Sequence, residues 1–437
     1  MSLSRRHFLR SAAAVSAGFL GLRALHLDPL HAQDAPGYGD LVADPKKVIS
    51  LPKDFTYAIL SRTGETMDDG LLVPAAHDGM AAFPGPEGRT LLVRNHELTA
   101  ESGVGPFGAK GALLEKIEAD RLYDPSGCGG TTTLVFDTKA GRLEKHFLSL
   151  GGTYRNCAGG PTPWGSWITC EENTTRAGGR AQKDHGWCFE VPASAAPGLA
   201  RATPLAGLGR FNHEAAAVDA KTGHVYLTED QRDGLLYRFT PDRKGDLAAG
   251  GKLQALAIKG RPGADTSNDG KGETIAVGKP VDVEWVDLDG IDAPKDDLRK
   301  RGREKGAATF ARGEGMWYGR DAVYFCCTSG GARDKGQVWR LAGDRLELFV
   351  EPNDAAVLEN CDNITVAPWG DLVLCEDGPG RNALVGVTPA GRLYRLAENA
   401  MNTSEFAGAC FSPDGTTLFV NIQTPGLTIA ITGPWKK

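Results

Sequence analysis

The sequence of 437 residues lacks the short motifs that mark the commonest small metal-binding modules. It has nine cysteines but no pair with the spacing Cys-x-x-Cys, which excludes the usual structural zinc motifs. No segment matches the EF-hand loop, which excludes the simplest kind of calcium site. Lys and Arg number 49 against 55 Asp and Glu, for a net charge of −6. A chain without a basic excess gives no indication of nucleic-acid binding.

Long apolar runs are missing as well. The apolar segment 12–22 is too short to span a bilayer, so we expect no stable membrane anchor. It follows Arg5-Arg6, a pair typical of a twin-arginine export signal, although a chance pair before an anchor is the alternative. We therefore expect a leader over residues 1–32, export by the twin-arginine translocase, and a periplasmic or secreted protein. Residues 33–437 would form a single domain with a charged insertion near 286–311.

Glycine and proline are abundant, with 57 and 25 residues, as a chain of many short strands and turns requires. Segment 157–170 is typical of a β-hairpin, because a short strand leads to the turn Pro163-Trp164-Gly165 and a second strand returns. Similar segments, most with 13 to 15 residues from opening to closing residue, recur along the chain. They span 77–97, 214–229, 314–327, 362–376 and 406–421. Six such hairpins predict an all-β fold, a six-bladed β-propeller with loop and helix insertions.

Acidic residues recur at the ends of these hairpins. In a propeller, both ends of each inner hairpin converge on one mouth of the central channel. The residues predicted to lie at this mouth are Glu97, Cys170, Glu171, Glu172, Glu214, Glu229, Asp230, Glu314, Asp362, Glu376 and Asp377. Carboxylates cannot crowd in this way without cations, so the pattern predicts a polynuclear metal site. The alternative for any single acid is a solvated loop carboxylate or a turn cap.

The ligand types narrow the choice of metal. Carboxylate oxygens suit calcium, magnesium, manganese and ferric iron, whereas a thiolate suits a softer or redox-active metal. Cys170 precedes two carboxylates at a strand end, while Cys157 and Cys188 are most simply buried apolar residues or occasional disulfide partners. The predicted metal ligands are Cys170, Glu171, Glu214, Glu229, Asp230, Glu314, Glu376, Asp377 and Glu97. Such a set is plausible for iron together with calcium.

Basic side chains adjoin some of these acids. His77, His96 and His213 are either ligands themselves or hydrogen-bond donors to ligands. Arg312 lies two residues before Glu314, and a guanidinium beside a metal cluster is suited to bidentate binding of phosphate. The alternative is that Arg312 only neutralises its acidic neighbours. Arg94 is a weaker second candidate for binding phosphate.

These residues resemble the PhoX alkaline phosphatases over nearly the whole chain after the leader. The resemblance rests on the twin-arginine leader and on several motifs. These motifs are Arg94-Asn-His-Glu97, Gly160-Pro-Thr-Pro-Trp-Gly-Ser-Trp-Ile-Thr-Cys-Glu-Glu172, Gly209-Arg-Phe-Asn-His-Glu214, Thr228-Glu-Asp230, Arg312-Gly-Glu314, and the segment 368–377. The resemblance implies a six-bladed propeller that carries two ferric ions, calcium ions and a bridging oxo group.

The same resemblance implies roles for single residues. Cys170 matches an iron-ligating cysteine, Glu214 and Glu314 match metal-ligating glutamates, and Arg312 matches a phosphate-binding arginine. The predicted activity is the hydrolysis of small phosphate monoesters by a monomeric protein. Arg312 and Cys170 are the predicted catalytic residues, with Cys170 holding iron rather than attacking the substrate. Two alternatives stay open, a calcium-dependent lactonase-like propeller and a metal-binding propeller without catalytic activity.

Overall fold

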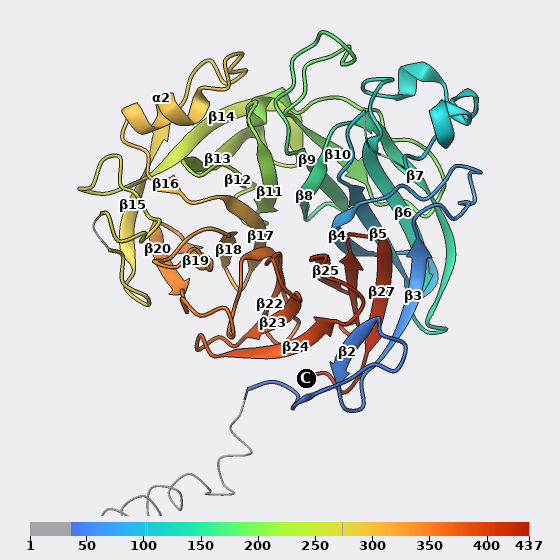
Figure 1. Cartoon of the computed structure of the whole chain (residues 1–437). Coiled ribbons are helices and arrows are strands. Elements are labelled where there is room, and N and C mark those ends of the chain that lie inside the picture. The colour runs from blue at the N-terminus through green and yellow to red at the C-terminus, as the bar shows by residue number, and fades with distance from the viewer. Residues whose placement is uncertain (1–35, 101, 103, 273, 437) are drawn as a thin grey trace, which may run out of the picture. The chain divides into compact units, whose positions relative to one another are not determined.

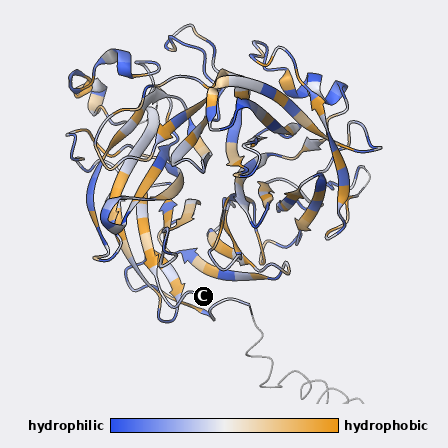
Figure 2. Cartoon of the chain, turned by 180° about the vertical axis from the view of Figure 1, so that it is seen from behind, coloured by the Kyte–Doolittle hydropathy of each residue, from blue (hydrophilic) through white to orange (hydrophobic). Residues whose placement is uncertain are grey.

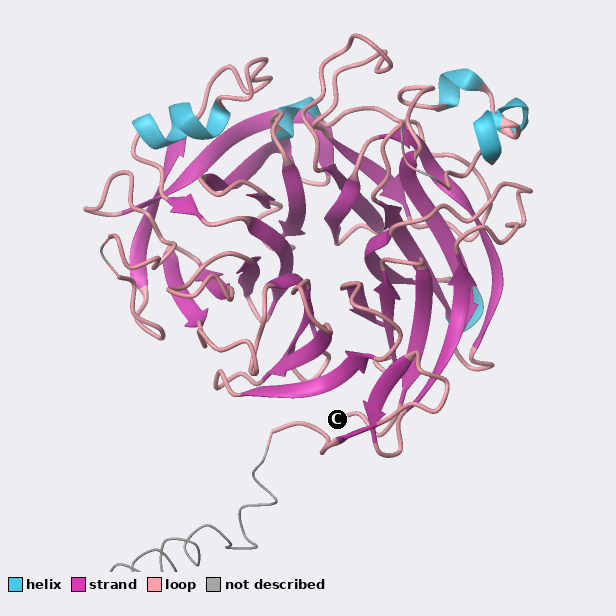
Figure 3. Cartoon of the chain, in the orientation of Figure 1, coloured by secondary structure: helices cyan, strands magenta, loops and turns pink. Residues whose placement is uncertain are grey.

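The computed structural model describes residues 36–436 except 101, 103 and 273, so the predicted leader lies outside the described residues. Contacts within the chain separate Met1–Gly37 from one compact unit, Tyr38–Lys437. Strands dominate this unit, and its described part has one α-helix, α2 (Leu298–Glu304), within the predicted charged insertion. Figure 3 shows how few helices accompany the strands. None of the helices in the described part is both long enough and apolar enough to cross a membrane.

Five hydrogen-bonded sheets make up the unit Tyr38–Lys437. The first two consist of β4 (His77–Pro84), β5 (Arg89–His96), β6 (Gly129–Asp137) and β7 (Arg142–Thr153), and of β8 (Asn156–Pro161), β9 (Ser166–Glu171) and β10 (Cys188–Pro192). A ten-stranded sheet contains β11 (His213–Val218), β12 (Val225–Glu229), β13 (Gly234–Arg243), β14 (Asp246–Ile258), β15 (Val281–Asp287), β16 (Thr309–Phe310), β17 (Gly313–Gly319), β18 (Ala322–Cys327), β19 (Gln337–Ala342) and β20 (Arg345–Val350).

The last two sheets combine strands from both ends of the unit. One contains β1 (Leu41–Val42), β2 (Ile49–Pro52), β21 (Cys361–Val366), β22 (Leu372–Glu376), β23 (Ala383–Val387) and β24 (Leu393–Asn399). The other contains β3 (Thr56–Arg62), β25 (Phe406–Phe411), β26 (Thr417–Ile422) and β27 (Leu427–Thr432). Because β3 pairs with β27, the first and last parts of the unit are joined by backbone hydrogen bonds. Short 3-10 helices occupy Pro86–Gly88, Ala109–Gly111, Leu114–Lys116, Ala119–Arg121 and Ala206–Leu208.

Six strands form a closed ring at the centre of the unit. In order around the ring, β4 contacts β8, then β11, β17, β21 and β25, and β25 contacts β4 again. Figure 1 shows these strands facing the centre, with the other strands of each sheet farther out. The fold is therefore all-β and propeller-like, as predicted. The sheets defined by hydrogen bonds number five, because β15 joins the strands β11–β14 to β17–β20 in a single sheet.

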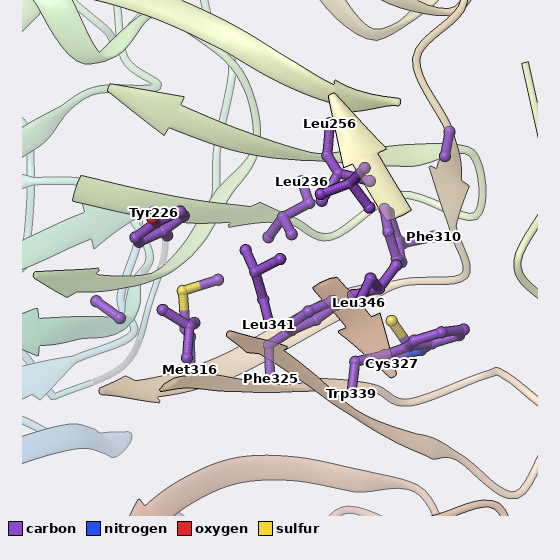
Figure 4. Close-up of a cluster of buried hydrophobic side chains, with 14 of the residues drawn as sticks. Tyr226, Leu236, Leu256, Phe310, Met316, Phe325, Cys327, Trp339, Leu341 and Leu346 are labelled. Atoms are coloured by element: carbon purple, nitrogen blue, oxygen red, sulfur yellow. The ribbon is translucent and has the colours of Figure 1, made fainter. Parts of the chain in front are cut away.

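Apolar side chains fill the space between neighbouring sheets. Figure 2 shows hydrophobic residues concentrated along the strands and hydrophilic ones on many of the connecting loops. In the cluster drawn in Figure 4, Leu236 and Leu256 of β13 and β14 meet Phe325 and Trp339 of β18 and β19. All four are fully buried. The two halves of the ten-stranded sheet thus pack against each other through apolar surface, the main source of stability in such a fold.

Each ring strand carries a β-bulge at the same place. In β8/β9, for example, Asn156 faces Glu171 but Gly159 faces Thr169, so Cys157 and Ala158 together oppose the single residue Cys170. The register shifts in the same way in the pairs β4/β5, β11/β12, β17/β18, β21/β22 and β25/β26. Because a bulge redirects the side chain of the extra residue, five of the six hairpins can each aim one side chain toward the centre, while the sixth has Gly408 at this position.

Asn95 of β5 connects one bulge to the next hairpin. Its Nδ2 donates to the carbonyl oxygens of Cys157 (3.1 Å) and Ala158 (2.7 Å). Its Oδ1 accepts from Trp167 Nε1 and Thr169 Oγ1, both at 2.8 Å. The amide is fully buried and uses all four of its hydrogen-bonding positions within the protein.

Asn95→Ala is expected to lower the free energy of unfolding by about 3 kcal/mol, because it leaves several buried polar groups without partners. Denaturant unfolding followed by circular dichroism measures this loss. Gln182→Ala is the control, since Gln182 is exposed and such a substitution changes stability by roughly 0.5 kcal/mol or less. Equal losses in the two variants would contradict this role for Asn95.

Candidate functional site

The six bulges place one residue each around the centre of the ring. We call these residues the bulge ring, and they are Asp78, Cys157, Glu214, Glu314, Asp362 and Gly408. A second set follows directly after the second strand of each hairpin. We call it the rim ring, and it consists of Glu97, Glu172, Asp230, Thr328, Asp377 and Gln423. Eleven of the twelve positions carry a carboxylate, thiol, amide or hydroxyl group, all but Gly408. The amide is that of Gln423, which donates to Asp78 and Glu97.

Five members of the bulge ring and two of the rim ring bring donor atoms close together. Three overlapping groups have all their ligand atoms within 4.8 Å of one another. They are Asp78 with Glu97 and Cys157, Cys157 with Glu172 and Glu214, and Glu214 with Glu314 and Asp362. Because Cys157 and Glu214 each belong to two groups, the donors form one continuous series. The arrangement could hold several metal ions side by side.

The carboxyl groups of this series are buried and strongly perturbed. Burial raises the pKa of Asp78, Glu214 and Glu314 well above the usual range, and neighbouring carboxylates raise it further. Burial, with Glu97 and Asp230 nearby, raises the pKa of Glu172 to about 9 although Arg155 opposes the shift. Without cations, the protein therefore favours the protonated acids at this site.

The Glu214 carboxylate shows most directly that this site needs a cationic partner. Both of its carboxylate oxygens are buried, and neither has a hydrogen-bond partner among the described residues. One carboxylate oxygen of Asp362 is likewise buried without a hydrogen-bond partner among the described residues. Buried carboxylate oxygens are almost always paired, because leaving them without a partner costs several kcal/mol or forces protonation. Metal ions would satisfy these oxygens, so the residues present fit a metal centre.

Arg312 borders the two rings. Its Nε and Nη2 donate to the two oxygens of Asp230 at 2.7 and 2.8 Å, and Nη2 also donates to Glu314 Oε1 at 2.9 Å. These hydrogen bonds, first of all that to Asp230, raise the pKa of the guanidinium. The side chain is 36% exposed, and its backbone has φ of 56°, in the left-handed region. A fixed cation thus faces the mouth beside the clustered acids.

Three predicted ligands lie elsewhere. Glu171, Glu229 and Glu376 each accept a hydrogen bond from the backbone at or just before the start of the next strand. The donors are Gly186 N at 2.8 Å, Leu235 N at 3.2 Å and Ala383 N at 2.9 Å. The structure does not bring these acids together with the bulge ring, because side chains alternate along a strand and the following residue faces the mouth instead. They hold the loops after the second strands.

Cys170 also faces away from the rings. It is the residue opposite the bulge, and its Sγ lies 3.5 Å from Cys188 Sγ, which lies 3.3 Å from His213 Nδ1. This group sits in a hydrophobic cluster with residues such as Phe211. The thiol among the acids is that of Cys157, for which the sequence suggested a buried apolar residue or a disulfide partner. Cys157 is the opening residue of its hairpin, as Glu214 and Glu314 are of theirs, and this shared position could have identified it as a ligand.

The histidines and Arg94 lie outside the donor series as well. Arg94 is fully buried and donates to Thr132 Oγ1 and Thr428 Oγ1, with His77 Nδ1 3.1 Å from its Nη1. His96 Nε2 lies 2.9 Å from the same Thr132 hydroxyl. A guanidinium enclosed in this way cannot reach a ligand at the mouth. Sequence reasoning also missed three residues that are placed at the rings, Asp78, Arg155 and Glu405.

Removing metals should make the stability of the protein depend on pH. Folded-state pKa values raised to about 9 at Glu172 and about 7 at Asp377, mainly by burial, exceed those of an unfolded chain. Their contribution to stability is therefore complete below about pH 4 and is lost as the pH rises through these folded-state values. We expect the unfolding temperature of chelator-treated protein to fall by roughly 5 °C or more between pH 5 and pH 9.

Thermal unfolding followed by circular dichroism across this pH range tests that expectation. The metal-loaded protein should show a smaller decrease, because bound cations compensate the ionised acids. In the metal-free state, Glu172→Gln should flatten the profile. A metal-free profile that is flat, or that rises with pH, would contradict the crowding of acids at the mouth.

Comparison with protein families matches residues 36–149 and 141–426 to the family described as "Alkaline phosphatase PhoX". No curated protein sequence matches the chain. Among solved structures, PhoX of Pseudomonas fluorescens in complex with vanadate, a transition state analogue, matches with a TM-score of 0.65. The sequences are 21% identical, and the match covers 91% of this chain and 98% of that one, so it establishes the fold alone.

Two further structures are much more distant. Virginiamycin B lyase from Staphylococcus aureus has a TM-score of 0.35 at 13% identity, covering 87% of this chain and 99% of that one. A gluconolactonase of Xanthomonas campestris has a TM-score of 0.40 at 11% identity, covering 92% and 99%. Likenesses at this level carry no argument about function.

Proposed function

The chain belongs to the PhoX family of alkaline phosphatases, and from this membership we propose that it hydrolyses phosphate monoesters at a metal cluster held by the bulge ring and the rim ring. Membership makes the chain a phosphoric ester hydrolase. The observation that carries the finer proposal is the Glu214 carboxylate, which is buried with both oxygens unpartnered in the part of the chain that the structure describes. A phosphatase that works without metals would have no reason to bury such a group among other acids.

The metal ligands we assign are drawn from the overlapping donor groups. They are Asp78, Glu97, Cys157, Glu172, Glu214, Glu314 and Asp362, with Asp230 and Asp377 as further rim residues. We assign the thiolate role to Cys157 in place of Cys170, since only Cys157 lies among the carboxylates. Many carboxylate oxygens with one thiolate suit ferric iron together with calcium. Bound there, these ions would supply Lewis-acid activation of the phosphoryl group.

The residues of the chain supply binding and orientation. The Arg312 guanidinium is planar and permanently charged, and it points into the mouth from beside Asp230 and Glu314. It is placed to bind two oxygens of the phosphoryl group and to stabilise the charge that develops on them in the transition state. Holding both carboxylates keeps Arg312 in one orientation before substrate arrives, so little ordering remains to be done during reaction.

Three broader features belong to the same proposal. We count the sheets as six blades, one for each bulged hairpin, because the ring strands β11 and β17 each begin a set of their own within the ten-stranded sheet. The protein is exported by the twin-arginine translocase, directed by the leader pattern at Arg5-Arg6. In the periplasm or outside the cell, it acts as a monomer on small phosphate esters.

One experiment tests the proposed function directly. Protein exported with its own leader is assayed for iron and calcium per chain, for visible absorbance, and for hydrolysis of a chromogenic phosphate monoester. We expect iron and calcium, a thiolate-to-iron absorption band, and turnover that a chelator abolishes. Calcium alone, without colour or phosphatase activity, would contradict the proposed iron–calcium cluster and favour a lactonase-like or non-catalytic role.

A further inference from the structure

A cavity of about 380 Å³ opens beside the wall of the mouth that Glu97 and Glu172 form. Three of its lining residues are close in sequence to that wall. Tyr154 precedes Arg155, Asn173 follows Glu172, and Thr99 lies two residues after Glu97. Arg180 brings a positive charge to the lining, and the other walls combine polar and apolar groups. The cavity is large enough for the alcohol part of a small phosphate ester.

Arg155 stands at the corresponding place in its hairpin to Arg312. Each lies two residues before a bulge-ring donor, Cys157 or Glu314, and each has a left-handed backbone, with φ of 47° and 56°. Each also contacts two ring carboxylates. Arg155 Nη2 lies 2.6 Å from Glu97 Oε1 and 2.5 Å from Glu172 Oε2. Two guanidinium groups therefore occupy equivalent positions in two of the six hairpins.

These contacts leave part of the Arg155 guanidinium able to bind another group. It is 40% exposed, and its Nη1 makes no hydrogen bond to the described residues. If Glu97 and Glu172 turn toward metal ions, the charge of Arg155 becomes available to another anion.

A row of charged groups connects the two arginines. Glu172 binds Arg155 on one side, and its carboxyl lies against Asp230, which binds Arg312 on the other. Asn212 Nδ2 spans the middle, donating to Glu172 Oε1 at 3.3 Å and to the carbonyl of Asp230 at 3.2 Å. A ligand with anionic groups at both ends could lie along this row, with one end at each guanidinium.

We propose that Arg155 and the adjoining cavity form a subsite for a second anionic group, so that the preferred substrates are phosphate monoesters whose alcohol part carries a carboxylate or a further phosphate. This inference rests on the proposed phosphatase function. The phosphoryl group to be cleaved binds at Arg312, and the second anion binds at Arg155, with Tyr154 and Asn173 beside it. Arg155 is a specificity-determining residue and takes no part in the chemical step.

The test compares two substrates of the same length, 3-phosphoglycerate and glycerol 3-phosphate, which differ in a carboxylate against a hydroxymethyl group. With the metal-loaded, full-length protein, kcat/KM should be higher for 3-phosphoglycerate. Arg155→Gln should lower the ratio of the two kcat/KM values at least tenfold, and Arg155→Lys, which keeps the charge but loses the planar fork, should lower it less. Metal content per chain, measured in parallel, should stay the same in Arg155→Lys.

Arg176→Gln is the matched control, because Arg176 is an exposed arginine paired with Asp184 outside the rings. It should leave the ratio unchanged. A ratio that Arg155→Gln and Arg155→Lys do not alter, or an equal fall for both substrates with loss of metal, would overturn the subsite. Wild-type protein that hydrolyses neither ester would refute the phosphatase function itself, which distinguishes that failure from failure of the subsite.

Discussion

Arg312→Ala is expected to lower kcat/KM for a phosphate monoester by about 10³-fold while metal content stays near that of the wild type. The guanidinium binds Asp230 through both oxygens and reaches Glu314, so its position is fixed at the mouth. Charge on the phosphoryl oxygens grows toward the transition state, and a fixed bidentate donor stabilises that state more than the substrate. Alanine removes this stabilisation without removing a metal ligand.

The measurement is steady-state kinetics together with metal analysis of the same preparations. Arg345→Ala serves as the control, since Arg345 is an exposed arginine far along the sheet whose partner is Asp282. Arg312→Lys should recover only part of the activity, because an ammonium cannot bind two oxygens in a plane. If Arg312→Ala kept wild-type kinetics, phosphate would have to be bound elsewhere, and the role of Arg312 would be to neutralise Asp230 and Glu314.

Cys157→Ser is expected to abolish thiolate-to-iron absorbance and to lower turnover by about 10²-fold or more, since a hard oxygen replaces the single soft ligand. Cys157 belongs to two of the overlapping donor groups, so its loss affects both neighbouring metal positions. Burial, with Asp78 and Glu214 nearby, raises the pKa of its thiol, so only a bound cation makes the thiolate accessible at neutral pH.

Cys170→Ser is the matched comparison for Cys157→Ser, because both thiols are buried in the same hairpin. It removes the contact with Cys188 in the hydrophobic cluster and should leave the absorbance in place. Absorption and iron content, measured on the two variants side by side, decide between the two cysteines. Loss of colour in Cys170→Ser alone would return the ligand role to Cys170.

The repeat of hairpins was readable from the sequence because turns and strand lengths are local properties. The structure brings the opening residues Glu214, Glu314 and Asp362 together, since each lies at the start of an equivalent strand. The resemblance of the motifs to one family pointed to the same fold. What the sequence could not show was the bulge, which depends on pairing between strands and shifts the alternation of side chains by one residue.

At the closing ends, residues that are neighbours in sequence have different surroundings in the structure. Cys170 lies opposite the two-residue bulge and packs in a hydrophobic cluster, whereas Glu172 follows the end of the strand and lies among the donors of the mouth. Adjacent acids such as Glu376 and Asp377 look interchangeable in sequence, yet one holds a loop and the other lies near Asp362. Glu405 was missed because it lies in a loop before β25 and not at the end of any hairpin.

The pairing of β3 with β27 governs when the site can exist during synthesis of the chain. The donors come from hairpins spread between residues 78 and 362, but the ring they line is sealed by the strand Leu427–Thr432. A ribosome must therefore have produced almost the entire polypeptide before the ring that holds all the donor groups can close. We therefore expect the full set of ions to be bound after translation, wherever the chain first folds.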